Sequence, residues 1–288
     1  MRWTPGGSSD DVEDRRDSGG GGGRGGGGFK LGIGGFLILG VLSLVFKTDL
    51  ISPFLSSSGG GSSRVVDSPA NPARTASEEK LKEFVTFVLN DNQDTWTKLL
   101  AEQGAQYRRA KLVLFRDSVD SACGAAESAT GPFYCPGDQK VYIDLGFYDE
   151  LRERFGAPGD FAQAYVLSHE IGHHVQNLLG IEQKMRAAQR QNPRLEKALS
   201  VRMELQADCF AGIWGHTTQQ RNLLEANDVQ EGLAAAASVG DDRIQKAATG
   251  HVSPESFTHG SSAQRMEWFQ RGYNSGRIQD CNTFARDR

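Results

Sequence analysis

The 288-residue chain has little excess of either charge, few cysteines and hardly any long apolar stretch. Its 32 basic and 36 acidic residues give a net charge of −4. This balance argues against a nucleic-acid-binding protein, which usually carries a strongly basic surface. Its four cysteines form no CxxC pair, which argues against a cysteine-rich zinc site. What remains is a chain long enough for one or two domains with a hydrophobic core.

The four cysteines, at 123, 135, 209 and 281, are an even and widely spaced set. Such a set favours two disulfides in an oxidising compartment. Pairing Cys123 with Cys135 and Cys209 with Cys281 is the most economical arrangement. The sequence alone does not decide among the possible connectivities.

The longest apolar stretch is "LGIGGFLILGVLSLVF" (residues 31–46), which contains no charge. It predicts a transmembrane anchor over 29–50, whose flanking lysines reach the membrane surfaces. A buried core helix and a cleaved signal peptide are the alternatives. The polar, glycine-rich residues 1–28 predict a disordered tail, and the serine- and glycine-rich residues 51–74 predict a flexible linker. Neither flank offers a domain to bury the run, and no small-residue cleavage site follows it.

Positive charges are more frequent before the apolar run than after it. Arg15, Arg16, Arg24 and Lys30 precede the run, whereas Lys47 and Arg64 follow it. The positive-inside rule therefore predicts a single-pass protein whose N-terminus is cytoplasmic and whose remaining chain is exported.

Residues 75–288 predict one domain, α+β and mainly helical with a small sheet. A capping box of Thr75 and Glu78 begins the first predicted helix, and Asp160 and Gly180 bound the helix that carries three of the chain's six histidines. A polar connector follows Gly180. Strands are expected at 111–115 and 140–144, and helices at 75–100, 148–155, 161–179, 195–216, near 228–248 and at 261–271.

The sequence His169-Glu170-Ile171-Gly172-His173 matches HExxH. Residues four apart on a helix differ by about 40° around the axis and about 6 Å along it, so both imidazoles can bind one Zn²⁺. Glu170 lies about 100° away, where it can act as general base on a metal-bound water. A chance match on an ordinary helix is the alternative. His174 is on another face and is interpreted as a structural histidine.

A third zinc ligand has to come from elsewhere in the chain. Gln176 and Leu179 occupy the positions where a metzincin needs glycine and histidine, so that class is excluded. Glu204 and Asp208 share one face of a later predicted helix, with Glu204 as the candidate ligand. Asp208 is predicted to accept a hydrogen bond from a ligating histidine. A solvated acidic face is the alternative.

The chain resembles the neutral zinc metallopeptidases of bacterial envelopes. The motifs are "MRW" and "VEDRR" before the anchor, then "GPFYCP", "VYID", "AYVLSHEIGHHVQNLLG", "ELQADCFAG" and "THGSSAQRMEWFQRG". The resemblance implies a membrane-anchored, zincin-like domain with His169, His173 and Glu204 as zinc ligands and Glu170 as base. It implies a location at the bacterial inner membrane, with the catalytic domain periplasmic or extracellular.

The segment "THGSSAQR" (residues 258–265) resembles the His-Pro…Arg segment that follows the ligands in some gluzincins, with Gly260 in place of proline. By this resemblance His259 is a candidate oxyanion donor, and Arg265 a candidate partner of Asp208 or Glu204. Alternatively, the segment is a helix start in which serines cap and Phe269 packs into the core. The strand at 140–144 is expected either to bind substrate as an edge strand or to be paired on both sides.

The favoured function is a zinc endopeptidase that cleaves envelope polypeptides. A non-catalytic, zinc-stabilised scaffold or adaptor is one alternative, and a zinc hydrolase of a non-protein substrate such as cell-wall peptide is another. Glu170 favours an enzyme over a scaffold, because a structural zinc site has no use for a base. Besides substrate and membrane, the sequence identifies no partner.

Overall fold

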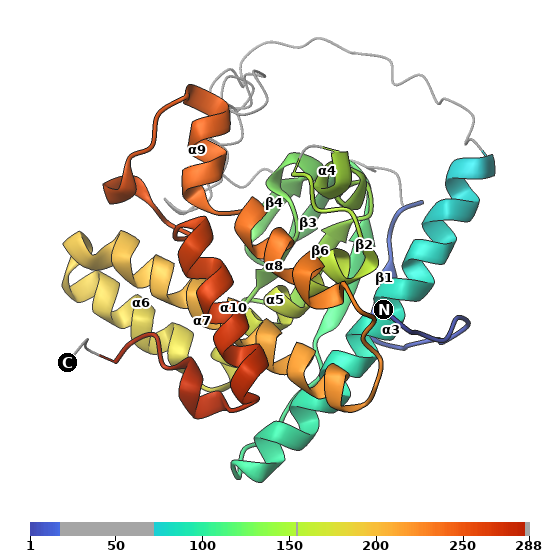
Figure 1. The fold of residues 1–288 in the computed structure, drawn as a ribbon, viewed down its shortest axis with the longest axis horizontal. Helices are drawn as coiled ribbons and strands as arrows, with labels where there is room; N and C mark the ends of the chain where they lie inside the picture. Colours follow the sequence, from blue (N-terminus) through green and yellow to red (C-terminus); the bar gives the residue numbers. More distant parts are fainter. Residues whose placement is uncertain (18–71, 154, 286–288) are drawn as a thin grey trace.

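The structure is a computed structural model that describes residues 1–17, 72–153 and 155–285. Helices make up most of it, beside a small sheet (Figure 1), so the predicted mainly helical α+β class is confirmed. The helices are α3 (Pro72–Glu102), α4 (Phe147–Glu153), α5 (Asp160–Leu178), α6 (Ile181–Gln191), α7 (Glu196–Gln220), α8 (Asp228–Ser238), α9 (Asp241–Thr249) and α10 (Ser262–Ser275). The strands are β1 (Val12–Asp14), β2 (Lys111–Phe115), β3 (Ser118–Ser121), β4 (Gly124–Glu127), β5 (Phe133–Cys135) and β6 (Lys140–Asp144).

Four of the strands form one sheet in the order β1-β2-β6-β5, and β3 and β4 form a separate hairpin. β2 runs parallel to β1 and β6, whereas β5 runs antiparallel to β6. The strands predicted at 111–115 and 140–144 are confirmed with those bounds. β6 is paired on both sides, so the edge-strand alternative for residues 140–144 is wrong. Among the described residues, β5 forms that edge of the sheet, and its three residues are too few to be recognised as a strand from the sequence.

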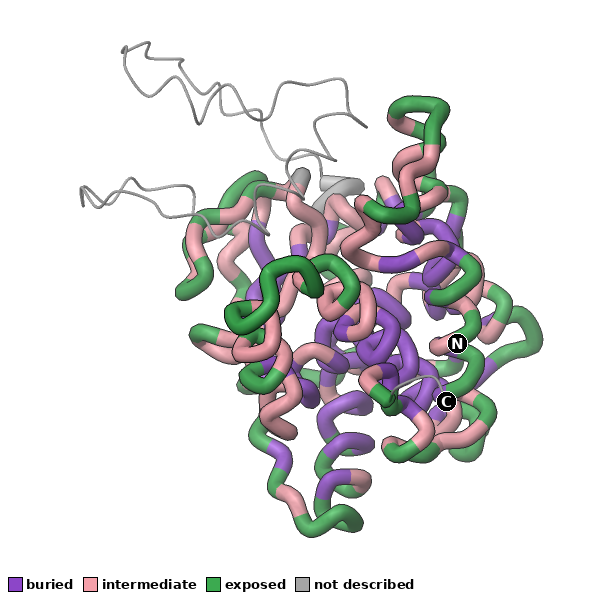
Figure 2. The backbone as a smooth tube through the Cα atoms, turned by 90° about the vertical axis from the view of Figure 1, so that its left-hand side faces the viewer, coloured by how far each residue is buried: buried purple, intermediate pink, exposed green. Residues whose placement is uncertain are grey.

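Helix α5 lies at the centre of the molecule (Figures 1 and 2). Fourteen of its 19 residues are buried, from Phe161 near its start to Gln176 near its end. A helix buried on nearly every side needs close neighbours. Helix α7 packs closely against α5 at Gly172 of α5. A β-carbon there would lie 3.0 Å from the carbonyl oxygen of Ala207. The backbone that carries both predicted histidine ligands is therefore held tightly against α7.

Helices α7 and α10 cross with their backbones in contact. A β-carbon on Gly212 would overlap the carbonyl oxygen of Phe269, and one on Gly272 would overlap that of Cys209. Ala207 faces α5, whereas Gly212 faces α10. Small residues on α7 therefore allow close packing against two different helices, α5 and α10.

Replacing Gly212 by alanine is expected to lower the free energy of unfolding by ~3 kcal/mol, at the upper end of typical overpacking costs, because backbone atoms cannot move aside as a side chain can. Chemical denaturation of the full chain measures this loss. Gly7→Ala is the matched control, since no atom lies within 4 Å of the added β-carbon. Equal stability of the two variants would contradict the close crossing.

Several predicted boundaries are wrong for local reasons. Helix α3 begins at Pro72, not at Thr75, because proline suits the first turn of a helix. Gly159 occupies the N-cap position of α5, and the side chain of Asp160 makes no capping bond. The predicted connector after Gly180 contains α6, whose Glu, Gln, Lys, Arg and Ala residues favour helix. The region 228–248 holds two helices, α8 and α9.

The prediction of a disordered tail over 1–28 is wrong for residues 1–17, which are folded against the domain. β1 joins the sheet, and Met1, Trp3 and Val12 contribute to the hydrophobic core. The average apolar content of residues 1–28 is low because a few apolar residues that pack on the core are counted together with many glycines. The predicted anchor over 29–50 and all but the last three residues of the linker over 51–74 lie outside the described residues. Among the described helices, none has the length and apolar character needed to cross a membrane.

Candidate metal centre

Three side chains from two helices converge at the middle of α5. His169 and His173 come from successive turns of α5, and Glu204 comes from α7. The Nε2 atoms of the two histidines lie 3.2 Å apart, and that of His169 lies 3.2 Å from Glu204 Oε2. The third separation, from His173 Nε2 to Glu204 Oε1, is 3.6 Å. The structure therefore brings together the three predicted ligands.

The spacing of these atoms fits a zinc ion. Ligands about 2.05 Å from a tetrahedral zinc lie about 3.35 Å from one another, close to the separations of 3.2, 3.2 and 3.6 Å found here, two of which end on different oxygens of the Glu204 carboxylate. Two imidazoles and one carboxylate are also a ligand set that zinc prefers. The donor set and its spacing thus both suit Zn²⁺.

A buried hydrogen-bond network orients His169 through Nδ1, the ring nitrogen that does not face the other two ligands. Asp208 Oδ1 lies 2.9 Å from His169 Nδ1, as predicted for a carboxylate that orients a ligand. Arg265 donates to Asp208 from Nε at 2.8 Å and from Nη2 at 2.9 Å. Its Nη2 lies 4.0 Å from Glu204, so Asp208 is its main partner. Tyr165, one turn before His169, also donates to Asp208.

The second histidine has its own orienting residue. His173 Nδ1 lies 2.8 Å from Gln176 Oε1, and the Gln176 amide donates to the carbonyl of Met203 on α7 at 2.8 Å. In the sequence, Gln176 stands out only as a departure from the metzincin pattern, and neither Gln176 nor Tyr165 was predicted to orient a ligand. Their positions three residues after His173 and four before His169 place both on the ligand face, which is the signal that could have identified them.

Charges across the cluster stabilise one another. Burial lowers the pKa of His169, but the carboxylates of Asp208 and Glu204 outweigh it and raise that pKa to about 9. Burial opposes ionisation of Glu204, yet the two histidines hold its pKa well below the usual range. Asp208 likewise stays ionised, because Arg265 and His169 lower its pKa against the effect of burial. The cluster is therefore built to keep both carboxylates charged.

A cavity of about 1060 Å³ opens onto the three ligands and Glu170. Burial raises the pKa of Glu170 above its ordinary value, which makes its carboxylate a stronger base. Apolar side chains from several elements form much of the wall, including Phe133 of β5, Phe147 of α4 and Ile244 of α9. A large, partly apolar cavity with a few convergent polar groups is typical of a substrate site.

His259 lines the same cavity, in the loop before α10. Its Nδ1 lies 3.0 Å from Asp241 Oδ1, and the second oxygen of Asp241 accepts the backbone N–H groups of Thr258, His259 and Gly260. The alternative interpretation of the segment as a helix start is confirmed, because Ser261 caps α10 and Phe269 is fully buried. The role of Asp241 was missed because only the tertiary fold brings α9 to this loop.

The other histidines lie away from the ligands. His174 is fully buried, with Nδ1 3.0 Å from the hydroxyl of Tyr134 and Nε2 2.6 Å from the carbonyl of Arg108. Its interpretation as a structural histidine is confirmed. His216 forms a hydrogen bond through Nδ1 with the carbonyl of Tyr273, and His251 is exposed.

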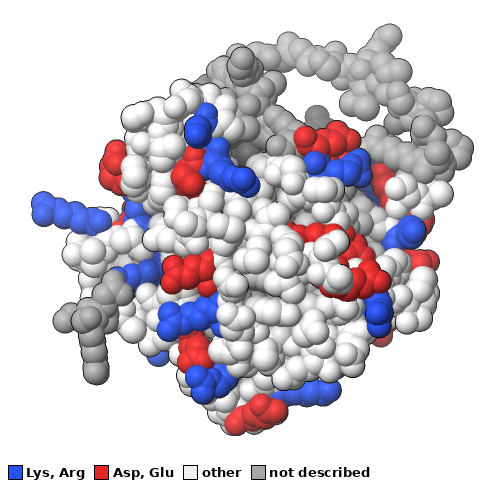
Figure 3. All heavy atoms as spheres, in the orientation of Figure 1, with Lys and Arg blue, Asp and Glu red and all other residues white. Residues whose placement is uncertain are grey.

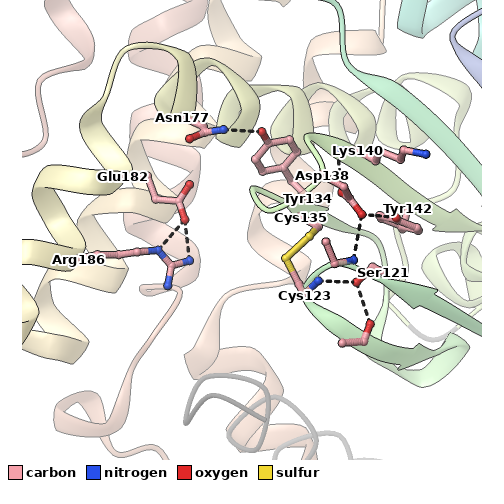
Figure 4. Close-up of a disulfide and its surroundings, with 12 residues drawn as sticks. Ser121, Cys123, Tyr134, Cys135, Asp138, Lys140, Tyr142, Asn177, Glu182 and Arg186 are labelled. Atoms are coloured by element: carbon pink, nitrogen blue, oxygen red, sulfur yellow. Dashed lines mark hydrogen bonds and ion pairs between the residues drawn. A yellow bond between two sulfur atoms is a disulfide. The ribbon is translucent and has the colours of Figure 1, made fainter. Parts of the chain in front are cut away.

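Two disulfides brace the site, with the predicted pairing of Cys123 with Cys135 and Cys209 with Cys281. The first joins the loop after β3 to β5, beside Tyr134, whose hydroxyl accepts a hydrogen bond from Asn177 of α5 (Figure 4). The second joins α7, one residue after Asp208, to the C-terminal segment. Both therefore restrain elements that line or carry the site.

A family model described as "Putative neutral zinc metallopeptidase" matches residues 1–284. The chain is 46% identical over 291 residues to "Uncharacterized protein YpfJ" of Escherichia coli (strain K12), with 99% of each chain covered. It is 46% identical over 190 residues to "Uncharacterized protein Rv2575" of Mycobacterium tuberculosis (strain ATCC 25618 / H37Rv), covering 62% of this chain and 64% of that protein. No solved structure matches the chain.

Proposed function

The chain belongs to the family described as "Putative neutral zinc metallopeptidase", and we propose that it is a zincin-like endopeptidase acting on bacterial envelope proteins. The observation that carries this proposal is the position of Glu170. It shares a cavity with three residues that can each offer one ligand atom to a metal ion, the three atoms lying within 4.8 Å of one another. Three protein ligands are typical of catalytic zinc sites, which keep a further position for water or substrate.

Bound zinc would act as a Lewis acid and lower the pKa of its water. Glu170 accepts the proton of the attacking water and passes it to the leaving amine. Asp241 binds His259 Nδ1 and, against the effect of burial, raises the pKa of this ring, so that the protonated imidazole donates from Nε2 to the developing oxyanion. Asp208, fixed by Arg265, keeps His169 in its ligand orientation.

The substrate is proposed to bind as an extended peptide along β5. This strand lies at the edge of the four-stranded sheet among the described residues, and Phe133 and Tyr134 line the cavity. An edge strand offers backbone N–H and C=O groups to a peptide of any sequence. Such binding suits an endopeptidase with broad selectivity.

The domain is proposed to work outside the cytoplasm, at the bacterial inner membrane. The two disulfides support an oxidising compartment. Acidic and basic side chains are mixed on the face that Figure 3 shows, which fits the proposal that nucleic acid is not a partner.

The test is removal and return of the metal. Chelation of the full-length protein is expected to abolish cleavage of an unfolded protein substrate, and stoichiometric zinc to restore it. Glu204→Gln is expected to reduce bound zinc from about one ion per chain to a small fraction, because one of three ligands is lost. Metal analysis measures this, with Glu196→Gln on the same helix as control. A wild-type protein that binds no zinc would show the ligand assignment to be wrong.

His259→Ala is expected to lower kcat roughly 10²-fold, the effect of losing one oxyanion donor, with little change in KM or zinc content. Steady-state kinetics on a fluorogenic peptide separate the two parameters. The exposed His251 serves as the matched control, and His251→Ala should behave as wild type. A loss of zinc in His259→Ala would point instead to a structural role for this histidine.

A further inference from the structure

We infer that residues 1–17 are an integral part of the metallopeptidase domain and lie on the same side of the membrane as residues 72–285. A single membrane crossing between the two segments is thereby excluded. This replaces the single-pass arrangement predicted from the sequence, in which the N-terminus and the domain lie on opposite sides. The inference does not depend on whether the site hydrolyses peptides.

Backbone hydrogen bonds incorporate the segment into the sheet. β1 pairs in parallel with β2, with Val12 opposite Leu112 and Asp14 opposite Leu114. Leu112 N donates to the carbonyl of Asp11 at 2.7 Å, and Arg15 N donates to that of Leu114 at 2.8 Å. These bonds need the two strands about 4.8 Å apart. They cannot form across about 30 Å of hydrocarbon.

Apolar contacts extend the attachment to α3. The ring of Trp3 lies 5.4 Å from that of Phe84 and 6.4 Å from that of Phe87, measured between centroids. Met1 is 5% exposed, and Met1 and Val12 both pack on the main core. Removal of the segment would uncover this apolar surface of α3 and β2, which a domain folded without residues 1–17 would have to expose to water.

Ion pairs of both polarities connect the segment to the domain. Asp11 pairs with Arg109 at 2.6 Å, Glu13 with Lys140 at 2.7 Å, and Asp14 with Lys82 at 2.8 Å. In the reverse sense, Arg16 pairs with Glu79 at 2.5 Å. Each exposed pair contributes little alone. The change from acidic residues at 11–14 to a basic residue at 16, each opposite a residue of the other charge, nevertheless favours one register of β1 on its neighbours.

The segment also reaches the helix that carries the ligands. The amino group of Met1 lies 2.5 Å from Asp160, the first residue of α5, and 3.3 Å from Asp228 of α8. Asp160, Asp228 and Glu231 form an acidic cluster whose oxygens lie within 4.8 Å of one another. The positive charge of this amino group compensates their repulsion. Residues 1–17 thus link the sheet, α3 and the start of α5.

The first experiment tests whether the two segments are neighbours in the full-length chain in its membrane. Ser9 Oγ donates to Asn90 Oδ1 at 2.9 Å, and the native cysteines are all in disulfides. Ser9→Cys with Asn90→Cys should therefore be joined by a short bismaleimide. After cleavage at a protease site engineered between residues 56 and 63, the N-terminal fragment should stay attached to the domain.

The matched control is Ser9→Cys with Lys184→Cys. Lys184 is exposed on α6, far from β1 in Figure 1, and this pair should release its N-terminal fragment on cleavage. Release of the fragment from the Ser9–Asn90 pair as well would overturn the inference.

The second experiment compares the two segments directly across the membrane. Ser8→Cys and Lys98→Cys each replace an exposed residue, one in each segment. A membrane-impermeant maleimide applied to intact spheroplasts should label both variants, or neither of them. Labelling of one variant with complete protection of the other, reversed in inside-out vesicles, would overturn the inference.

Discussion

Glu170→Gln is expected to lower the rate of peptide hydrolysis about 10³-fold while one zinc ion per chain remains bound. General-base catalysis contributes roughly 10²–10⁴-fold to a reaction rate. Glutamine keeps the shape of the side chain but cannot accept the proton of the attacking water. Glu170 is 8% exposed and lines the cavity, but it is not one of the three clustered ligands. The loss should therefore appear in kcat and not in metal content.

The measurement pairs single-turnover cleavage of an unfolded protein with zinc analysis of the same sample. Glu267→Gln is the matched control, because Glu267 is exposed on α10. If both wild type and Glu170→Gln hold zinc and neither cleaves a broad peptide library, the proposed peptidase is wrong. The non-catalytic scaffold or a zinc hydrolase of another substrate would then gain support. Equal cleavage by both would mean that another group accepts the proton.

Arg265→Met is expected to lower the free energy of unfolding by ~3–5 kcal/mol, because it leaves the buried carboxylate of Asp208 without its cation. Arg265 is 3% exposed and Asp208 is fully buried. The same change frees Asp208 from its fixed orientation behind His169, so zinc affinity should fall by roughly 10–100-fold. Chemical denaturation with and without excess zinc separates the two effects.

Arg271→Met is the matched control on the same helix. Arg271 is exposed and stacks on Trp268 at 4.8 Å, so its loss should cost about 1 kcal/mol or less. The double variant Asp208→Asn with Arg265→Met should recover part of the stability, because no uncompensated charge remains. If Arg265→Met is as stable as Arg271→Met, Asp208 is not the buried anion described here.

Prediction from sequence worked best where the chemistry lies within one helix. The helical repeat predicts that His169 and His173 bind the same ion. Glu204 and Asp208 lie four residues apart on one helical face, which predicts that both face the site. Tyr165 and Gln176, which orient Asp208 and His173, obey the same repeat and could have been identified from it. Prediction was weaker where short or polar elements were involved, as with β5 and α6. Their formation depends on neighbours that the local pattern does not reveal.

Residues 1–17 show why composition misleads. Glycines and charged side chains outnumber the apolar ones there, so the average indicates disorder. The core contacts come from Met1, Trp3 and Val12, and acidic residues of the segment meet opposite charges on α3, β2 and β6. No local property of residues 1–17 predicts which residues of the domain they contact.

Residue types and their spacing were enough to predict the ligand helix and the acidic residues of α7, because the helical backbone converts spacing directly into geometry. The family followed from motifs spread along the whole chain. Tertiary structure alone decided which strand lies at the sheet edge, how Asp241 reaches His259, and that the N-terminal segment belongs to the domain. Each of these contacts joins residues far apart in the chain. Such contacts exist only once the packing of the whole core has set the distances between elements.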